Sequence, residues 1–517
     1  MSALLACTDV ATMDDSFVKA RDDLVARLRR VAPTGSNSLH FLRAAHARRI
    51  PWSLVSNNTF QFGWGRLAQW MDSSFTGNTP AIGVRLVREK MATAELLSRI
   101  GLPVASSQLA MSAEHAVKIA SALGYPVVVK PADRDGGVGV AANLRSPEKV
   151  RAAFEAAEKL SRKVMVQKHV AGQDYRLTVF NGRLMWAVHR RPGGVVGDGV
   201  NTVARLLEIL NSDPRRGTTY KSPLKILRFD AEAADLLAEQ AMTLESVPRE
   251  GEFVLLRNAA NTASGGSVEA VNDRVHPDNR QLAEDVARAA RLDLAGVDLL
   301  IEDISRSWHE IGAHICEVNS QPQLGFTTQQ HLYGDIVGEL VSGNGRIPVL
   351  LLIGRNGINS LVRETISHPA FKGLNVGVAA SSGTWINGEK MLATASVYHG
   401  TQLLLSSRNV DLALVIVSDS SVLRTGLPVD RFDLMVLRSA PLARENETAL
   451  LQTLIRLFRN NVEGPCLVNW DDVDCASAAS LLKPATVQRL VASGTEIATR
   501  IAETLGDLRD QCLRKSA

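Results

Sequence analysis

The amino-acid sequence predicts an α/β protein built in two parts. Short β-branched runs such as residues 125–131 alternate with amphipathic helical stretches such as residues 147–160, and this alternation is typical of α/β layers. Residues 342–348 then form a glycine-containing stretch typical of a linker. Beyond it, fully apolar runs at residues 349–353 and 412–417 indicate buried strands of a second α/β unit.

Length, charge and cysteine content limit the classes of protein to consider. With 517 residues the chain is long enough for two or three domains. The net charge is only +4 and the charges are interspersed, which gives no reason to expect a nucleic acid partner. Five scattered cysteines without metal-ligand spacing favour a reducing compartment. Without a signal peptide or an apolar run of membrane-spanning length, we expect a cytoplasmic protein that binds no membrane.

Local signals in the first part set several element boundaries. Residues 15–30 predict a charged helix that ends before Gly35. Ser146 and Pro147 are typical of a helix N-cap and first helical position. Asn181-Gly182 lies between two apolar alternating runs and predicts a β-hairpin.

Two carboxylates and a carboxamide are expected to face one point. Asp298 lies in an apolar strand, and Glu317 and Asn319 alternate along a second one, so their side chains share a face. All three are hard oxygen ligands, as Mg²⁺ prefers, and magnesium held by few protein oxygens usually also binds phosphates. Two buried strands with a polar edge would give the same pattern, so the spacing alone leaves both interpretations open.

Lys130 ends a buried strand directly before a glycine-rich loop. The loop contains Gly136, Gly137 and Gly139, at which backbone N–H groups can approach phosphate oxygens without side-chain obstruction. A lysine extending its ammonium to solvent beside an ordinary turn would look the same.

The order of these pieces is more specific than any one of them. Between about residues 38 and 346, a strand with a lysine, a glycine loop, a hairpin, paired arginines and acidic strands follow one another. This order resembles the ATP-grasp superfamily of carboxylate–amine ligases, especially cyanophycin synthetases and the ligase domain of bifunctional glutathione synthetases. The segments that carry the resemblance are residues 172–177, 197–203, 211–217, 261–266, 295–298 and 316–319.

The resemblance implies a role for each candidate residue. The positions that match nucleotide-binding residues are Lys90, Lys130, Gly136, Gly137, Gly139, Gln167, Lys168 and Asp174. Gln167 stands where the family usually has Glu at the adenine hinge, and Asp174 matches the acid that binds the ribose. Arg190 or Arg191 matches the arginine near the transferred phosphate, and Arg257 and Asn261 resemble residues that meet the substrate. Asp298, Glu317 and Asn319 match magnesium ligands, so ATP and two Mg²⁺ ions are the implied cofactors.

The second part resembles the Mur ligases but lacks their phosphate loop. Residues 354–360 read Gly-Arg-Asn-Gly-Ile-Asn-Ser where that family has Gly-Thr-Asn-Gly-Lys-Thr-Thr. Ile358 thus replaces the phosphate-binding lysine and Asn359 the metal-binding hydroxyl, while the expected glutamate falls near Ile416. Because an apolar side chain can do neither job, we expect a truncated, non-catalytic remnant.

These features predict four segments. They are an N-terminal helical extension at residues 1–37, an ATP-grasp ligase domain with α+β lobes at 38–345, a degenerate Mur ligase-like α/β domain at 346–440 and a C-terminal helical segment at 441–517.

The resemblance further implies an ATP-dependent, ADP-forming ligase that makes an amide bond through an acyl phosphate. Amino acids or short peptides are the expected substrates, and a homo-oligomer is the expected assembly. A cyanophycin-type polymerase of preformed dipeptides and a nucleotide-binding pseudoenzyme scaffold are the alternatives. Single coupling is favoured because residues 322–327 lack the cationic groups of the family's Pro-Gly-Leu-Arg-Met-His, and because the family's large N-terminal domain is absent.

Overall fold

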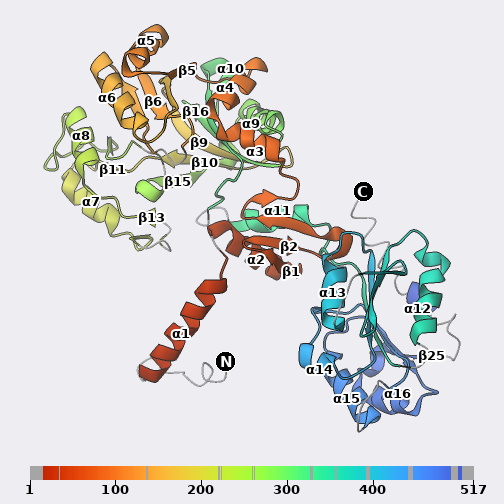
Figure 1. Cartoon of the computed structure of the whole chain (residues 1–517). Coiled ribbons are helices and arrows are strands. Elements are labelled where there is room, and N and C mark those ends of the chain that lie inside the picture. The colour runs from red at the N-terminus through yellow and green to blue at the C-terminus, as the bar shows by residue number, and fades with distance from the viewer. Residues whose placement is uncertain are drawn as a thin grey trace.

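The computed structural model contains two large bodies with a small layer between them (Figure 1). It describes residues 15–33, 35–134, 138–218, 222, 224–258, 260, 262–325, 330–355, 358–391, 396–440, 446–490 and 499–503. Both helices and sheets are present throughout, which confirms the predicted α/β class. Among the described residues, no helix is long and apolar enough to span a membrane.

The N-terminal region begins with α1 (Asp15–Val31), which extends away from the rest of the chain in Figure 1. The helix predicted there is therefore present. The next elements form the layer between the two bodies: α2 (Ser36–Ala47), β1 (Trp52–Ser56), β2 (Thr59–Phe62), β3 (Gln69–Asp72), β4 (Phe75–Thr76) and α11 (Gln330–Leu340). Their shared core includes Phe41, Phe62 and Tyr333, all almost fully buried.

A four-stranded antiparallel sheet forms the first lobe around the candidate site. Its strand order is β5 (Ser107–Ala110), β8 (Val164–Lys168), β6 (Val127–Pro131) and β7 (Ala141–Leu144). The helices α5 (Ala113–Leu123) and α6 (Pro147–Glu158) pack against it. The Ser146 hydroxyl accepts a hydrogen bond from the Lys149 amide, so the predicted start of α6 is confirmed.

A five-stranded sheet forms the second lobe. Its order is β15 (Ser267–Ala270), β10 (Arg183–Arg191), β9 (Gln173–Phe180), β16 (Leu294–Ile301) and β17 (His314–Asn319). The helices α3 (Ala81–Arg88), α4 (Lys90–Arg99) and α9 (Pro277–Ala289) share its core. Asn181 and Gly182 both have positive φ between β9 and β10, so the predicted hairpin is confirmed.

A smaller unit follows the five-stranded sheet in the chain. It comprises β11 (Gly194–Val196), α7 (Val203–Asn211), α8 (Ala231–Glu239) and β14 (Phe253–Leu255), with the short strands β12 (Arg216–Gly217) and β13 (Leu224–Lys225) beside them. β11 and β14 pair in an antiparallel two-stranded sheet, and α7 and α8 share its apolar core.

The C-terminal body is built on an eight-stranded sheet. The strand order is β21 (Glu389–Lys390), β20 (Gly383–Ile386), β19 (Val376–Ala380), β22 (Leu412–Val417), β18 (Val349–Ile353), β23 (Leu434–Leu437), β24 (Cys466–Asn469) and β25 (Val487–Leu490). Apolar clusters lie on both faces of this sheet. Burial on both faces explains why the runs at 349–353 and 412–417 are apolar at every position.

The segment 441–517 differs from the predicted helical tail. It contains α15 (Glu447–Phe458) and α16 (Val473–Ala478), but also β24 and β25, which extend the parallel sheet from β23. The apolar run of β24 is short, which makes it a weak signal beside the strong helical pattern of α15.

Candidate active site

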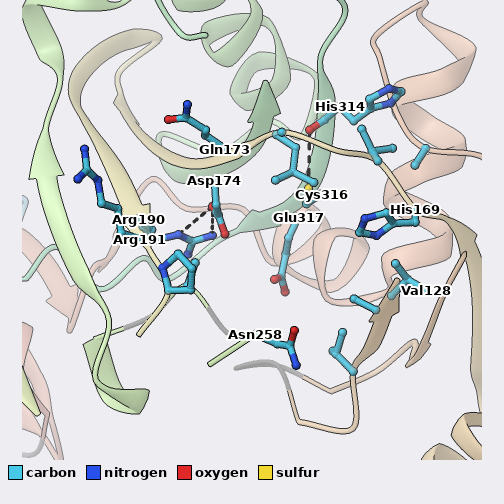
Figure 2. A pocket seen from close by; sticks show the side chains of 18 of the residues that line it. Val128, His169, Gln173, Asp174, Arg190, Arg191, Asn258, His314, Cys316 and Glu317 are labelled. Carbon is cyan, nitrogen blue, oxygen red and sulfur yellow. Dashed lines mark hydrogen bonds and ion pairs between the residues drawn. The ribbon is translucent and has the colours of Figure 1, made fainter. Parts of the chain in front are cut away.

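A cavity of about 960 Å³ lies where the two lobes meet (Figure 2). Side chains from β6, β8, β9, β10, β14 and β17 line it. The sequence-predicted residues among them are Lys90, Lys130, Gln167, Lys168, Asp174, Arg190, Arg191 and Glu317. The fold therefore brings together residues that are more than 200 positions apart in the chain.

Two ammonium groups approach Glu317 within this cavity. Lys90, the first residue of α4, places its Nζ 3.2 Å from Oε1 of Glu317 and donates to the Arg134 carbonyl at 2.5 Å. Lys130 leaves β6 on the cavity side, and burial lowers the pKa of its ammonium although Cys316 and Glu317 counteract the effect. The two ammonium groups can bind an anionic ligand, and the carboxylate can bind a metal ion that accompanies it. This part of the cavity is therefore suited to a metal-bound anion.

The two residues at the predicted adenine hinge contact the main chain. Nε2 of Gln167 lies 3.5 Å from the Ala105 carbonyl oxygen, and Nζ of Lys168 donates to the Gly124 carbonyl at 2.8 Å. Lys168 therefore ties β8 to the turn after α5. Gly139 has a φ of 73° and lies against Pro131 rather than in the cavity lining, and Gly136 and Gly137 lie outside the described residues.

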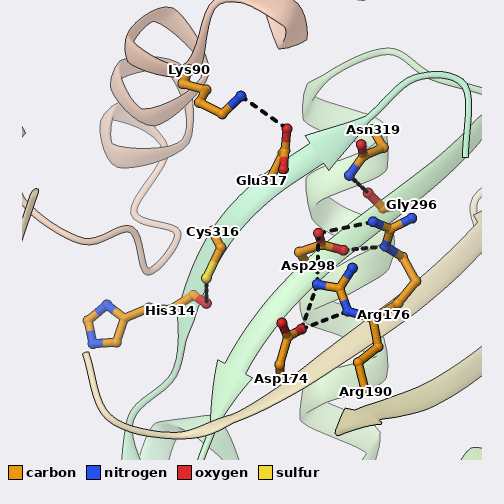
Figure 3. A network of polar contacts seen from close by, with 10 residues as sticks. All are labelled: Lys90, Asp174, Arg176, Arg190, Gly296, Asp298, His314, Cys316, Glu317 and Asn319. Atoms are coloured by element: carbon orange, nitrogen blue, oxygen red, sulfur yellow. Dashed lines mark hydrogen bonds and ion pairs between the residues drawn. The ribbon is translucent and has the colours of Figure 1, made fainter. Parts of the chain in front are cut away.

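Four charged side chains form a chain of ion pairs beside the cavity (Figure 3). Arg190 Nη2 lies 2.6 Å from Oδ1 of Asp174 and 3.0 Å from Oδ2 of Asp298. Arg176 binds the same Asp298, with Nη2 3.0 Å from Oδ2 and Nε against Oδ1. The register of β9 and β16 places Arg176 directly opposite Asp298, which explains the contact.

Arg176 was not predicted as a site residue. Its only signal in the sequence is its position two residues after Asp174, which puts both side chains on one face of β9.

The pKa values of the two acids are shifted in opposite directions. Burial raises the pKa of Asp174 to about 6, and the nearby charge of Asp298 adds to the effect while Arg190 opposes it. Burial would also raise the pKa of Asp298, but the charges of Arg176 and Arg190 outweigh it and hold that pKa below its ordinary value. Asp298 is therefore the carboxylate that stays ionised.

The three predicted metal ligands lie on adjacent strands. Asp298 on β16 is directly opposite Glu317 on β17, and Asn319 is two residues further along the same face. Asn319 Nδ2 lies 3.5 Å from the Gly296 carbonyl. No cluster of three His, Cys, Asp or Glu suited to a metal occurs among the described residues, so the third oxygen would come from the Asn319 amide. Two carboxylates and an amide oxygen fit Mg²⁺.

Two of the remaining predicted residues, Arg191 and Arg257, pair with acidic side chains. Arg191 lines the cavity but is half-exposed and pairs with Glu269 at 2.8 Å. Arg257 is buried, donates to Asp230 Oδ2 at 2.8 Å and to the Arg228 carbonyl at 2.7 Å, and is not part of the cavity lining. The structure thus uses Arg257 to hold the start of α8. Asn261 lies outside the described residues.

The corresponding loop of the C-terminal body has different contacts. It leaves β18 at Gly354, and the Arg355 amide donates to the Ser439 hydroxyl at 2.9 Å. Ile416, at the position expected for a metal-binding glutamate, is 3% exposed and belongs to the apolar cluster on one face of the sheet.

Comparisons with known proteins give matches in the part of the chain that lines the cavity. Two family models match, an ATP-grasp domain at residues 83–176 and a RimK-like ATP-grasp domain at residues 238–342. The cyanophycin synthetase of Nostoc sp. is 32% identical over 77% of this chain and 45% of its own length. The bifunctional glutathione biosynthesis protein of Mannheimia succiniciproducens is 30% identical over 46% of this chain and 32% of its own.

A solved structure of a bifunctional glutathione synthetase from Pasteurella multocida is also similar in part. It is 25% identical, and the match covers 59% of this chain and 43% of that chain with a TM-score of 0.45.

Residues 83–176 and 238–342 therefore match ATP-grasp domains, as the order of the motifs predicts. The chain is similar in sequence to cyanophycin synthetases. The chain spans about half the length of the cyanophycin synthetases that it matches.

Proposed function

We propose that the chain is an ATP-dependent, ADP-forming ligase that joins a carboxylate to an amine at one active site. The observation that carries the proposal is that a single cavity joins Lys90, Lys130, Arg190 and Glu317, with Asp298 directly behind them. These are the charges that a magnesium nucleotide and a transferred phosphoryl group require.

We assign a different binding role to each group of residues around the cavity. Lys90 and Lys130 bind phosphate oxygens, Asp174 accepts hydrogen bonds from the ribose, and main-chain groups beside Gln167 bind the adenine. Arg190 or Arg191 faces the transferred phosphate. Asp298, Glu317 and Asn319 would hold Mg²⁺. The metal would supply charge neutralisation on the phosphate oxygens.

The reaction follows from the charges. A carboxylate oxygen of the acid substrate attacks the γ-phosphorus, and the bond to the β-phosphate oxygen breaks to release ADP. The amine nitrogen then attacks the acyl carbon, phosphate leaves with the bonding electrons, and the nitrogen loses a proton. Every species is anionic before the amide forms, so cation clamping and positioning account for most of the catalysis.

The acyl phosphate must be kept from water, and the β11–β14 unit is placed to do this. Val196 and Phe253 line the cavity from that unit, and both are substantially exposed. Closure of these apolar side chains over a bound substrate would exclude water from the reacting atoms.

Amino acids or short peptides are the proposed substrates, and a homo-oligomer is the proposed assembly. The experiment measures ADP release with Mg²⁺ and ATP across a panel of amino acids and dipeptides, and identifies products by mass spectrometry. One coupled product per ADP supports the ligase, and a ladder of products indicates a polymerase instead. Bound nucleotide without ADP release across the panel would contradict the proposal and indicate a scaffold.

A further inference from the structure

The two arginines that bind Asp298 have different surroundings. Arg190 lines the cavity and divides its guanidinium between Asp174 and Asp298. Arg176 does not line the cavity, and its Nε and Nη2 together contact both oxygens of Asp298. The side chain of Arg176 is 17% exposed and that of Asp298 is 7% exposed, so this ion pair is well shielded from water. Arg190 is thus placed to respond to a ligand, whereas Arg176 is placed behind the carboxylate.

The backbone beside Asp298 leaves room for Arg176. A Cβ added at Gly296 would lie 3.1 Å from Cδ and from Nη1 of Arg176, and 3.0 Å from Cβ of Pro322. Gly296 does not have a positive φ, so its backbone conformation does not demand glycine. The close approach of Arg176 and Pro322 favours glycine instead, because a side chain there would make one or both of them shift by a few tenths of an ångström.

The bidentate geometry leaves Asp298 able to bind a cation. An ionised carboxylate offers about four lone-pair sites on its two oxygens. Arg176 takes one on each oxygen, and a planar guanidinium fixes the plane of the carboxylate in a way that a lysine cannot. Arg190 contacts Oδ2 as well, at 3.0 Å, so about one of the four sites stays open to a cation.

We propose that Arg176 is a positioning residue that orients Asp298 as a metal ligand, and that Gly296 gives Arg176 the space it occupies against Asp298. This inference rests on the proposed function, since Asp298 has its metal role only there. Outer partners of metal ligands fix the orientation of those ligands, and replacing them commonly weakens metal binding about 10- to 100-fold. Arg176 acts through Asp298 and touches neither nucleotide nor substrate.

The test uses Mn²⁺ as the metal probe, with ADP, and measures free Mn²⁺ by electron paramagnetic resonance. The variants are Arg176→Lys, which keeps the charge but not the fork, and Gly296→Ala, which keeps both charged groups. The control is Arg183→Gln, which removes an exposed arginine of the same sheet that pairs with Glu339 of α11. Thermal melts and metal-free ADP binding are measured on every variant, since a purely structural role would alter these and not metal affinity alone.

We expect both site variants to bind Mn²⁺ about 10- to 100-fold more weakly than the wild type, with metal-free ADP binding unchanged and the control unaffected. If wild-type protein binds Mn²⁺ with ADP and both site variants bind it equally well, the inference is wrong while the proposed function stands. If wild-type protein binds no Mn²⁺ with ADP, the proposed function fails and the inference fails with it. Should Arg176→Lys not fold, Gly296→Ala decides by itself.

Discussion

Two loops in this chain leave a buried strand at a place suited to phosphate, and they have different chemistry. The loop after β6 begins beside Lys130, with Lys90 and Glu317 nearby. The loop after β18 has Ile358 where a phosphate-binding lysine would stand, and the neighbouring β22 carries the buried Ile416. Buried charges destabilise a fold unless they are paired. The first region therefore keeps charged groups that are costly to bury, whereas the second has apolar side chains at the two matching positions, one of which, Ile416, lies in the core of the sheet.

The comparison predicts the largest effect at Glu317. Replacing it with alanine removes a carboxylate that faces Lys90 and lies opposite Asp298. We expect magnesium-dependent ADP formation to fall at least about 100-fold while the melting temperature stays near that of the wild type. Glu339→Ala, which breaks a surface ion pair with Arg183, is the matched control. Undiminished turnover in Glu317→Ala would remove Glu317 from the metal site.

The second prediction is that replacing Lys130 weakens nucleotide binding without destabilising the fold. Burial disfavours its charge, so Lys130→Met exchanges a desolvated ammonium for an apolar group of similar length. We expect ADP affinity to fall about 10- to 100-fold, as for a lost charged hydrogen bond, and the free energy of unfolding to stay equal or rise. Calorimetric titration and chemical denaturation measure the two. A destabilised protein with normal ADP affinity would make Lys130 a structural residue.

A third, smaller effect is a pH dependence at Asp174. Because its pKa is raised to about 6 in the folded protein, the unfolded chain loses this proton first as pH rises. Asp174 therefore lowers stability progressively between about pH 4 and pH 6, by at most about 3 kcal/mol. The free energy of unfolding of Asp174→Asn, relative to the wild type, should therefore rise from about pH 4 to about pH 6. Above pH 6 this difference should stay constant. A constant difference between the two proteins from pH 4 to pH 7 would contradict the raised pKa.

The smallest effect is expected in the C-terminal loop. Ile358→Ala should change turnover by less than about twofold, since no phosphate contact is lost there. Ile358→Lys restores the missing charge, but the metal carboxylate is still replaced by Ile416. We expect it to add no second nucleotide site. A large loss of turnover in the folded Ile358→Ala protein would show that this half takes part in catalysis.

Sequence patterns predicted the local features and missed those that depend on register. The hairpin at Asn181, the N-cap at Ser146 and the shared face of Glu317 and Asn319 follow from local chemistry and strand alternation. The role of Arg176 does not, because its partner is 122 residues away on a strand that only the sheet brings alongside.

The same limit explains β24 and the contacts of Arg257. The substrate role of Arg257 stays a prediction, and the sequence did not show that its guanidinium donates to Asp230 and to the Arg228 and Leu256 carbonyls. The short apolar run of β24 becomes a strand because β23 lies beside it and supplies its hydrogen bonds.

The number of nucleotides bound per chain tests the central contrast most directly. Equilibrium titration of the whole protein with ADP and Mg²⁺ needs no knowledge of the substrates. One site per chain is expected, lost or strongly weakened in Lys130→Met and unchanged in Ile358→Ala. Two sites per chain, or a single site that survives Lys130→Met and disappears in Ile358→Ala, would contradict the assignment of the active site to the first region.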